Sequence, residues 1–465
     1  MPSTSQLQAL RDSLTPDATL LSDPSSFEFQ AHLQRWSNVN LRTPSAIVLP
    51  STEEDCLSII KWARSTGTPF VCKSGGMSLY STIDEAGIVI DLSDFSSVTY
   101  NESRSEATLV GGVRSKEVAM ELARHGVCTT LPSSNTVGAI PFFLNGGNSP
   151  LASKLGYASD NILRARLITA GGEIVNASDD EHTDLLFAIR GAGQFFGLVV
   201  SLTVRAYPVL EVFGNAQGRF WNGRFIFPLD RVAEVAEAMR HVVNNSTYCA
   251  GGLIMIAAPP PTRCPAIVVT ARVIHPKSEE LQGEVFKALY DLGPVASAGG
   301  MIPIENNGDS LQPLMAPGDF KKLRLTAIHV YDPSVFPEIA ELWRQMTTTC
   351  PDAMPSMFSI LWESQSPLPP TFATANGMHG IRFWANNLTW CTSAESQEVV
   401  QGYLEKVIAV TRRGQKPVEY VDFANSLREP ESPVHRRYHD LERLQRLRRL
   451  KMEWDPEGLF GGDLL

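Results

Sequence analysis

The sequence lacks the features that mark a secreted, membrane-spanning or metal-binding protein. Its seven cysteines are scattered and include no Cys-x-x-Cys pair, which favours reduced thiols over a disulfide framework or a zinc site. No stretch is apolar for long enough to cross a membrane, and residues 1–6 lack the basic start of a secretory signal. No cluster of His, Asp and Glu has the spacing of metal ligands. These absences predict a cytoplasmic protein without a metal.

The chain also lacks an excess of positive charge. With 40 Lys and Arg against 50 Asp and Glu, its net charge is −10, which argues against nucleic acid or an anionic membrane as a partner. It has no Walker-type loop and no Gly-x-Ser-x-Gly elbow, so nucleotide-triphosphatase and hydrolase chemistry have no support. What the chain does have is 465 residues, 43% of them hydrophobic, enough for two or three domain-sized cores.

A glycine pair in the first hundred residues is the first feature that points to a ligand. In Lys73-Ser74-Gly75-Gly76-Met77-Ser78, the adjacent glycines let successive backbone N–H groups point at one anion. Lys73 and Ser78 would add a charge and a hydroxyl donor. The stretch therefore has the composition of a phosphate-binding loop, and a plain turn is the alternative for the stretch taken alone.

The pattern along the whole chain predicts an α+β protein. Residues 1–43 are polar and weakly periodic, which indicates a helical arm, and residues 44–208 alternate short apolar strands with helices and glycine pairs. Residues 209–416 interleave helical patterns with β-like runs, which predicts an antiparallel sheet with helices on one face and the other face free to cover a cofactor. Residues 417–465 end in a predicted helix. Its apolar stripe is expected to face the core and consists of Leu441, Leu444, Leu447 and Leu450.

Several spaced motifs carry a family resemblance. In chain order they are Lys73-Ser74-Gly75-Gly76-x-Ser78, Thr136-Val137-Gly138, Gly146-Gly147, Gly156-x-x-Ser159-Asp160-Asn161, Arg190-Gly191-Ala192-Gly193-x-x-Phe196-Gly197 and, near the C-terminus, Leu447-x-x-x-Lys451-x-x-Trp454-Asp455-Pro456. Together they resemble the PCMH-type FAD-binding domain of the vanillyl-alcohol-oxidase superfamily, most nearly its berberine-bridge-enzyme-like oxidases. Several motifs in one order are more specific than a single glycine motif.

The resemblance implies both an architecture and a cofactor. It implies a two-subdomain FAD-binding domain at 44–208, a substrate domain at 209–416, and a return of 417–465 to the FAD-binding domain. The glycine loops would hold the diphosphate and pass close to the flavin ring. The residues assigned to FAD in this way are Lys73, Ser74, Gly75, Gly76, Met77, Ser78, Ser134, Thr136, Val137, Gly138, Gly146, Gly147 and Asn161.

Some positions depart from the family pattern. Relatives that bind flavin covalently have a histidine at the position of Met77, and some also have a cysteine at the position of Ser134. Methionine and serine do not form these bonds, so the resemblance implies FAD that is non-covalent or absent. Ser149 stands where relatives have a glycine, and in Tyr420-Val421-Asp422-Phe423-Ala424-Asn425 the second tyrosine of the family pattern is Phe423.

Five residues are candidates for chemistry on a substrate. Asp422 stands at a matched position near the expected ring, where partial burial would raise its pKa, and capping a turn is its alternative role. The others lie in or beside β-like runs, where a core or hydrogen-bonded role is the alternative. The candidates are Asp422, Tyr420, Trp384, His379 and Glu363.

Two functions remain open at this stage. The first is an FAD-linked oxidoreductase of secondary metabolism that oxidises a small, apolar metabolite, with a base taking a proton and the flavin taking a hydride. The second is a redox-inactive member of the fold that catalyses a cyclisation or isomerisation by positioning, with or without FAD. The substitutions at Met77, Ser134, Ser149 and Phe423 together favour the second more than any one of them would, whereas the usual redox role of the fold favours the first, which we take as the prediction. Nothing in the sequence predicts the oligomeric state.

Overall fold

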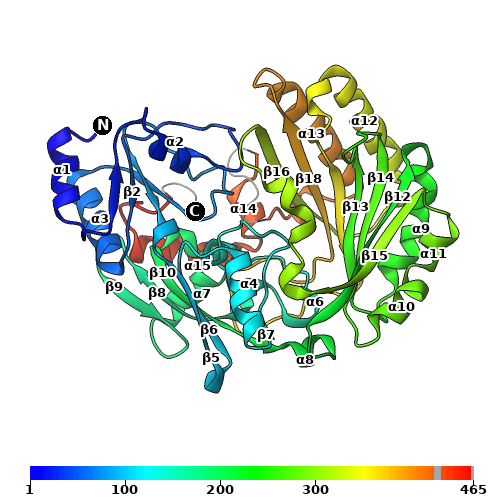
Figure 1. Cartoon of the computed structure of the whole chain (residues 1–465), viewed down its shortest axis with the longest axis horizontal. Coiled ribbons are helices and arrows are strands. Elements are labelled where there is room, and N and C mark those ends of the chain that lie inside the picture. Colours follow the sequence, from blue (N-terminus) through cyan, green and yellow to red (C-terminus); the bar gives the residue numbers. More distant parts are fainter. Residues whose placement is uncertain (424–430, 462–465) are drawn as a thin grey trace.

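The computed structural model describes residues 1–423 and 431–461. Three sheets of four or more strands organise the chain, two in its N-terminal half and one in its C-terminal half (Figure 1). The predicted boundary at residue 208 falls between the second and the third sheet. No helix within the described ranges is both long and apolar enough to cross a membrane. All seven cysteines are free thiols.

The first sheet is a small mixed sheet near the N-terminus. Its strands, in the order β1-β2-β4-β3, are β1 (Thr19–Leu21), β2 (Ala46–Leu49), β4 (Ile88–Asp91) and β3 (Phe70–Lys73), flanked by helices α1 (Thr4–Asp12), α2 (Phe27–Leu33) and α3 (Glu53–Thr66). Strands β2, β4 and β3 are parallel, whereas β1 pairs antiparallel with β2. The predicted helical arm thus contains helices α1 and α2, but also strand β1, which the prediction missed because a three-residue strand is too short for its pattern to show. Helix α3 ends at Gly67, whose φ of 65° is typical of a helix C-terminus.

The second sheet is antiparallel and completes the N-terminal half. Its strands, in the order β5-β6-β10-β8-β9, are β5 (Ser96–Asn101), β6 (Glu106–Gly111), β10 (Leu198–Arg205), β8 (Ile162–Ile168) and β9 (Ile174–Ala177), with helices α4 (Ser115–Arg124), α5 (Ala139–Leu144), α6 (Ala152–Leu155), α7 (Thr183–Ala192) and α15 (Leu441–Trp454). The C-terminal helix α15 thus returns to this half and buries Leu444, Leu447 and Leu450 in its core. Leu441 is 72% exposed because it begins the helix, so it does not belong to the predicted stripe.

The third sheet has seven antiparallel strands. In the order β15-β12-β14-β13-β17-β18-β16 they are β15 (Ala296–Pro303), β12 (Arg219–Pro228), β14 (Ala266–Val273), β13 (Ala250–Ala257), β17 (Phe358–Glu363), β18 (Phe383–Cys391) and β16 (Phe320–Ile328). Helices α9 (Val232–Asn244), α10 (Ser278–Val285), α11 (Lys287–Asp291), α12 (Phe336–Thr349) and α13 (Gln397–Thr411) cover the face turned away from the other two sheets (Figure 1). This is the predicted antiparallel sheet with helices on one face. Shorter elements, β7 (Val127–Cys128), β11 (Tyr207–Pro208), α8 (Val209–Phe213) and α14 (Val434–Arg437), connect the larger ones.

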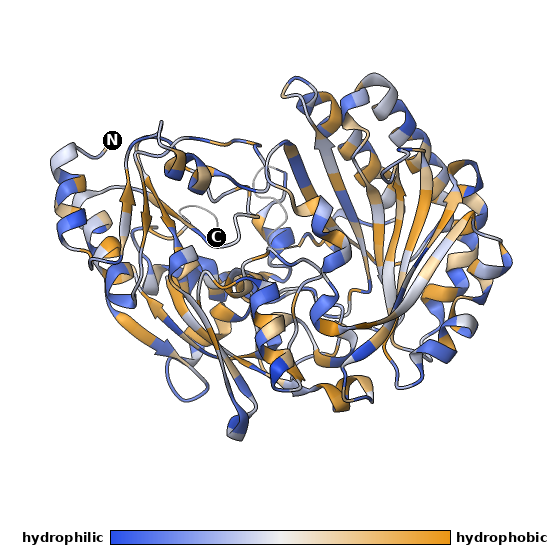
Figure 2. Ribbon diagram, viewed as in Figure 1, coloured by the Kyte–Doolittle hydropathy of each residue, from blue (hydrophilic) through white to orange (hydrophobic). Residues whose placement is uncertain are grey.

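The third sheet has a helix-covered face and an opposite face, which we call the inner face. Hydrophobic residues line its central strands, while the covering helices alternate hydrophobic and hydrophilic residues (Figure 2). Along β17, Ile360 and Trp362 belong to the core under the helices, whereas Leu361 belongs to a smaller cluster on the inner face. Because strand side chains alternate, Glu363 also points to the inner face. This face is turned towards the N-terminal half.

Three crossings tie the third sheet to the N-terminal half. The first is residues 35–39, which we call the strap, and the second is residues 364–382, the β17–β18 connection. The third is residues 421–423, which pair with the edge strand β16 through the Ala327 N–H to Val421 carbonyl bond and the Phe423 N–H to Leu325 carbonyl bond, at 2.8 and 3.1 Å. The inner face is therefore framed by segments from three distant parts of the chain.

Candidate functional site

The glycine loop, residues 73–78, leaves β3 and meets residues 136–138. A Cβ added at Gly75 would lie 2.2 Å from the Thr136 carbonyl oxygen, and one added at Gly138 would lie 2.3 Å from Ser74 Oγ. Both distances are far below van der Waals contact, so glycine is needed for the two backbones to approach this closely. Two of the segments assigned to FAD from the sequence are thus in direct contact.

The glycine loop offers unused backbone donors. Within the described part of the chain, the N–H groups of Gly75, Gly76 and Met77 have no hydrogen-bond partner. Gly76 has a φ of 66°, in the left-handed region that turns neighbouring N–H groups towards one side. Free N–H groups beside a second glycine segment fit a bound diphosphate.

Lys73 has a different role from the one predicted. Its Nζ atom lies 2.9 Å from Asp91 Oδ2 and also donates to the His32 carbonyl at 2.5 Å. Asp91 is 1% exposed. Burial would raise the pKa of Asp91, but the hydrogen bond from His32 and the charge and hydrogen bond of Lys73 outweigh it and lower that pKa. The Lys73 charge is therefore neutralised within the protein, and it anchors the start of the loop, leaving the backbone dipoles to meet an anion.

Met77 and Ser134, the two positions where the family resemblance leads us to expect covalent flavin attachment in relatives, each lie in a contact between a hydroxyl and a thioether. Thr136 Oγ1 lies 3.8 Å from Met77 Sδ, and Ser134 Oγ lies 2.9 Å from Met315 Sδ. Met77 therefore sits where the glycine loop meets residues 136–138. Neither position presents an imidazole or a thiol.

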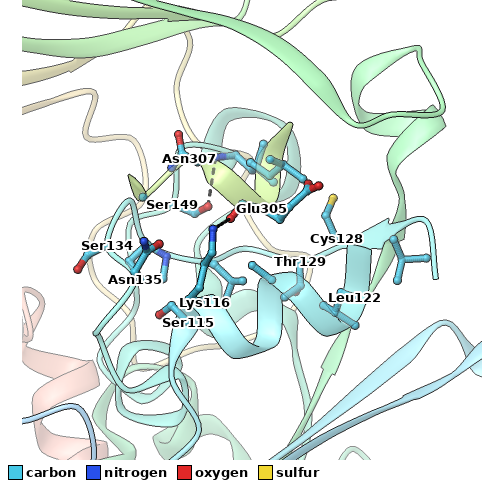
Figure 3. A pocket seen from close by; sticks show the side chains of 17 residues that line it. Ser115, Lys116, Leu122, Cys128, Thr129, Ser134, Asn135, Ser149, Glu305 and Asn307 are labelled. Atoms are coloured by element: carbon cyan, nitrogen blue, oxygen red, sulfur yellow. Dashed lines mark hydrogen bonds between the residues drawn. The ribbon is translucent and has the colours of Figure 1, made fainter. Parts of the chain in front are cut away.

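A small cavity lies beside Ser134, between α4 and residues 304–308 (Figure 3). Its volume is about 30 Å³, and Ser134, Asn135 and Ser149 contribute to its lining. Lys116 closes one side by donating to the Glu305 carbonyl at 2.9 Å. The cavity has room for a water-sized molecule only. It is too small for a flavin ring, so Ser149 lines a small void here.

The glycine pair Gly146-Gly147 and the later Gly191 lie against the β17–β18 connection. A Cβ at Gly146 would lie 2.3 Å from Met378 Cε, and one at Gly191 would lie 2.5 Å from the Asn376 backbone nitrogen. Gly191 also has a φ of 131°, so a larger residue would strain the backbone and displace the connection. Asn376 Nδ2 then donates to Ser159 Oγ at 3.1 Å. Part of the family's glycine pattern thus serves the docking of this connection.

Asn161 has its side chain committed within the protein. Its Nδ2 group donates to the carbonyls of Leu155 and Tyr157, both at 2.9 Å, and its Oδ1 accepts from the Tyr207 hydroxyl at 2.6 Å. The Asn161 side chain therefore stabilises the local structure, and any contact of this residue with FAD would have to come from its backbone.

His379 and Trp384 lie together at the end of the β17–β18 connection. His379 Nε2 lies 2.9 Å from Asp160 Oδ2, and its ring meets the Tyr157 ring edge-on, with centroids 5.3 Å apart. Trp384 is 1% exposed and packs on the inner face with Tyr157 and Phe423. The structure therefore brings together two of the predicted residues, a His–Asp pair and an aromatic wall, at the junction of the two halves.

Glu363 is a buried carboxyl group on the inner face. It is 4% exposed and forms an ion pair with Arg272 of β14 through Oε1, while Oε2 makes no hydrogen bond within the described residues. Burial raises the pKa of Glu363 to about 7, although Arg272 acts in the opposite direction. Arg272 Nε in turn donates to the Pro150 carbonyl at 3.3 Å, three residues past Gly147. The carboxyl group thus lies where the third sheet meets the segment that follows Gly146-Gly147.

Asp422 and Tyr420 do not reach the inner face. Asp422 is isolated from it by strand alternation, because Val421 and Phe423 on either side belong to the inner-face cluster. Its Oδ1 accepts from Arg412 Nη2 at 2.5 Å, at the end of α13. Tyr420 lies under the same guanidinium, 4.2 Å from the ring centroid. The structure places both on the helix-covered side, and Ala424 and Asn425 of this motif lie outside the described residues.

Some residues of the site gave no signal in the sequence. Arg272 and Asn376 are single polar residues in regions without a motif, and their partners lie far along the chain. The partnership of Lys73 with Asp91 had a signal, because the two residues end adjacent parallel strands and stand in register. Recognising that register would have shown that Lys73 is not a free cation.

The comparisons with known proteins match this geometry. Residues 44–178 match the family model described as an FAD binding domain. The chain is 30% identical over 298 residues to the FAD-linked oxidoreductase pgmH of Aspergillus terreus, a match that spans 63% of this chain and 59% of that protein. It is 26% identical over 450 residues to the FAD-linked oxidoreductase hasG of Aspergillus fumigatus, spanning 92% of this chain and 93% of that protein.

Solved structures share the fold over nearly the whole chain. The 6-hydroxy-D-nicotine oxidase of Arthrobacter nicotinovorans superposes with a TM-score of 0.82 at 22% identity, covering 96% of this chain and 97% of that one. A cysteine-to-alanine variant of berberine bridge enzyme gives a TM-score of 0.79 at 18% identity, covering 98% of each chain.

Residues 44–178 are therefore an FAD-binding domain, and over nearly its whole length the chain is similar to an FAD-linked oxidoreductase. Its fold is that of the berberine-bridge-enzyme-like oxidases, which confirms the resemblance found in the motifs.

Proposed function

We propose that the chain is an oxidoreductase that binds FAD without a covalent bond and oxidises a small, largely apolar metabolite of secondary metabolism. The observation that carries the proposal is the contact between the glycine loop and residues 136–138, with free N–H groups at Gly75, Gly76 and Met77, inside a matched FAD-binding domain. Met77 and Ser134 offer neither the imidazole nor the thiol that the family resemblance associates with a covalent bond to the ring. The named relatives are FAD-linked oxidoreductases, which does not favour the alternative of a redox-inactive cyclase or isomerase.

The chain's own residues would bind and deprotonate the substrate. Leu361, Trp384 and Phe423 form an apolar wall on the inner face, which suits an apolar substrate. Glu363 would take the proton, since a pKa of about 7 leaves much of it ionised near neutral pH and still basic enough to accept a proton. Arg272 would hold the carboxylate in place. When bound, FAD supplies a hydride acceptor that dioxygen can reoxidise.

Acid precipitation of the purified protein tests the proposal. We expect a yellow protein with flavin absorption bands, and we expect acid to leave the flavin in the supernatant. A yellow pellet would contradict non-covalent binding. Protein that stays colourless even after refolding with FAD would contradict the oxidoreductase function. Anaerobic bleaching of the flavin bands by members of a panel of small aromatic and aliphatic metabolites then identifies the substrate class.

A further inference from the structure

The strap donates hydrogen bonds to the glycine loop on both sides of Met77. The Trp36 N–H donates to the Gly76 carbonyl at 3.0 Å, and Arg35 Nη1 donates to the Ser78 carbonyl at 3.1 Å. Arg35 is 3% exposed, and its Nη2 also donates to the Val39 carbonyl at 2.8 Å, which fixes the shape of the strap itself. The loop therefore has a buried, charge-assisted anchor outside the conventional motif.

On its other side, the strap is bonded to residues 318–321, at the start of β16. The Gly318 N–H donates to the Arg35 carbonyl at 3.1 Å, and the Lys321 N–H donates to Ser37 Oγ at 2.9 Å. Lys321 is fully buried, and its Nζ atom donates to the Trp36 carbonyl at 3.1 Å. The same ammonium group lies 4.4 Å from the centroid of the Trp390 ring on β18.

These contacts form one continuous path from the third sheet to the glycine loop. Trp36 is bonded through its carbonyl to Lys321 and through its N–H to Gly76, so a single peptide segment joins the sheet to the loop. Every group on the path is buried or half-buried, where an unmade hydrogen bond is costly. The loop cannot move away from the inner face unless one of these bonds breaks.

We propose that Arg35 and Lys321 are positioning residues that, through the strap, hold the flavin loop at a fixed distance from the inner face. Neither residue is assigned a contact with substrate. The inference rests on the proposed function, because it requires FAD at the loop. Its consequence is that bound FAD is retained by a residue of the third sheet as well as by the FAD-binding domain.

A double-mutant cycle on FAD retention tests this path. The variants are Arg35→Lys, Lys321→Met and the two combined. Arg35→Lys keeps the positive charge but loses the guanidinium group, whose two Nη atoms donate to different carbonyls. The measurement is the rate at which free-flavin fluorescence appears after dilution of the loaded protein. If one path connects them, each single variant should lose FAD about tenfold faster, and the double variant should lose it at nearly the same rate as either single one.

Lys322→Met is the matched control. Lys322 is the next residue on β16, but its Nζ atom lies 3.1 Å from Glu431 and does not touch the strap. Its FAD loss rate should stay within about twofold of wild type, and its effect should multiply with that of Arg35→Lys. If Lys321→Met fails to fold, Ser37→Ala takes its place, because it removes the hydroxyl that accepts from the Lys321 N–H at 2.9 Å and so breaks a bond between the strap and β16.

The outcomes are distinct. Rates that multiply to about a hundredfold in the double variant, or equal rates for Lys321→Met and Lys322→Met, would overturn the proposal. A wild-type protein that never holds FAD would instead overturn the proposed function, and this is seen before any variant is made.

Discussion

Replacing Glu363 by glutamine should change how the stability of the protein depends on pH. Burial raises the pKa of this carboxyl group from 4.5 to about 7, so the folded protein binds its proton more tightly than the unfolded chain does. The stability that this adds is complete below about pH 4.5 and is lost as the pH rises through about 7. The shift is worth about 3 kcal/mol in total, of which about 2.5 kcal/mol is lost between about pH 5 and about pH 8.

The Glu363→Gln variant should lack this loss, because the amide is uncharged throughout and has nearly the same shape. The free energy of unfolding, measured by urea titration at several pH values, should therefore fall more steeply with pH in wild type than in the variant. Glu398→Gln is the control, because Glu398 lies exposed in the first turn of α13. For Glu398→Gln, the plot of the free energy of unfolding against pH should run parallel to that of wild type. Parallel curves for wild type and Glu363→Gln would refute the raised pKa and, with it, the argument for Glu363 as the base.

Two further substitutions test the geometry of the site. Gly75→Ala should weaken FAD binding at least about tenfold, because its Cβ would lie 2.2 Å from the Thr136 carbonyl, whereas Gly283→Ala, whose Cβ meets nothing within 4 Å, should leave the fluorescence titration with FAD unchanged. Asp422→Asn should lower the free energy of unfolding by about 3 kcal/mol, because it leaves the buried Arg412 charge unpaired, while the bound flavin is retained. Flavin loss in Asp422→Asn without loss of stability would show that Asp422 acts at the site after all.

The parts of the fold that the sequence predicted are those with repeated or ordered signals. The glycine motifs occur in a fixed order, so the FAD-binding domain could be recognised from them. The helices of the third sheet have clear apolar faces, as in α9, where Val235, Ala236 and Met239 are fully buried. Such patterns depend only on neighbouring residues in the chain.

What the sequence could not give depends on long-range pairing. Whether Asp422 faces the site or the helices is decided by the register of residues 421–423 against β16, and a shift of one residue would reverse it. The contact between Trp36 and Lys321 joins residues 285 positions apart, with no motif at either end. Glu363 was named as a candidate, but the burial that raises its pKa arises only when β17, β13 and β14 lie side by side.

The three crossings have a consequence for the order in which the protein is made. The strap is synthesised first, the β17–β18 connection follows, and residues 421–423 are the last of the three to be made and to pair with β16. Once they have paired, segments from three distant parts of the chain enclose the junction where the glycine loop lies. Because the core of the N-terminal half is complete only when α15, the last helix made, packs into it, we expect FAD to bind the finished chain. Protein that closes empty should take up FAD later only as fast as one of the three crossings reopens.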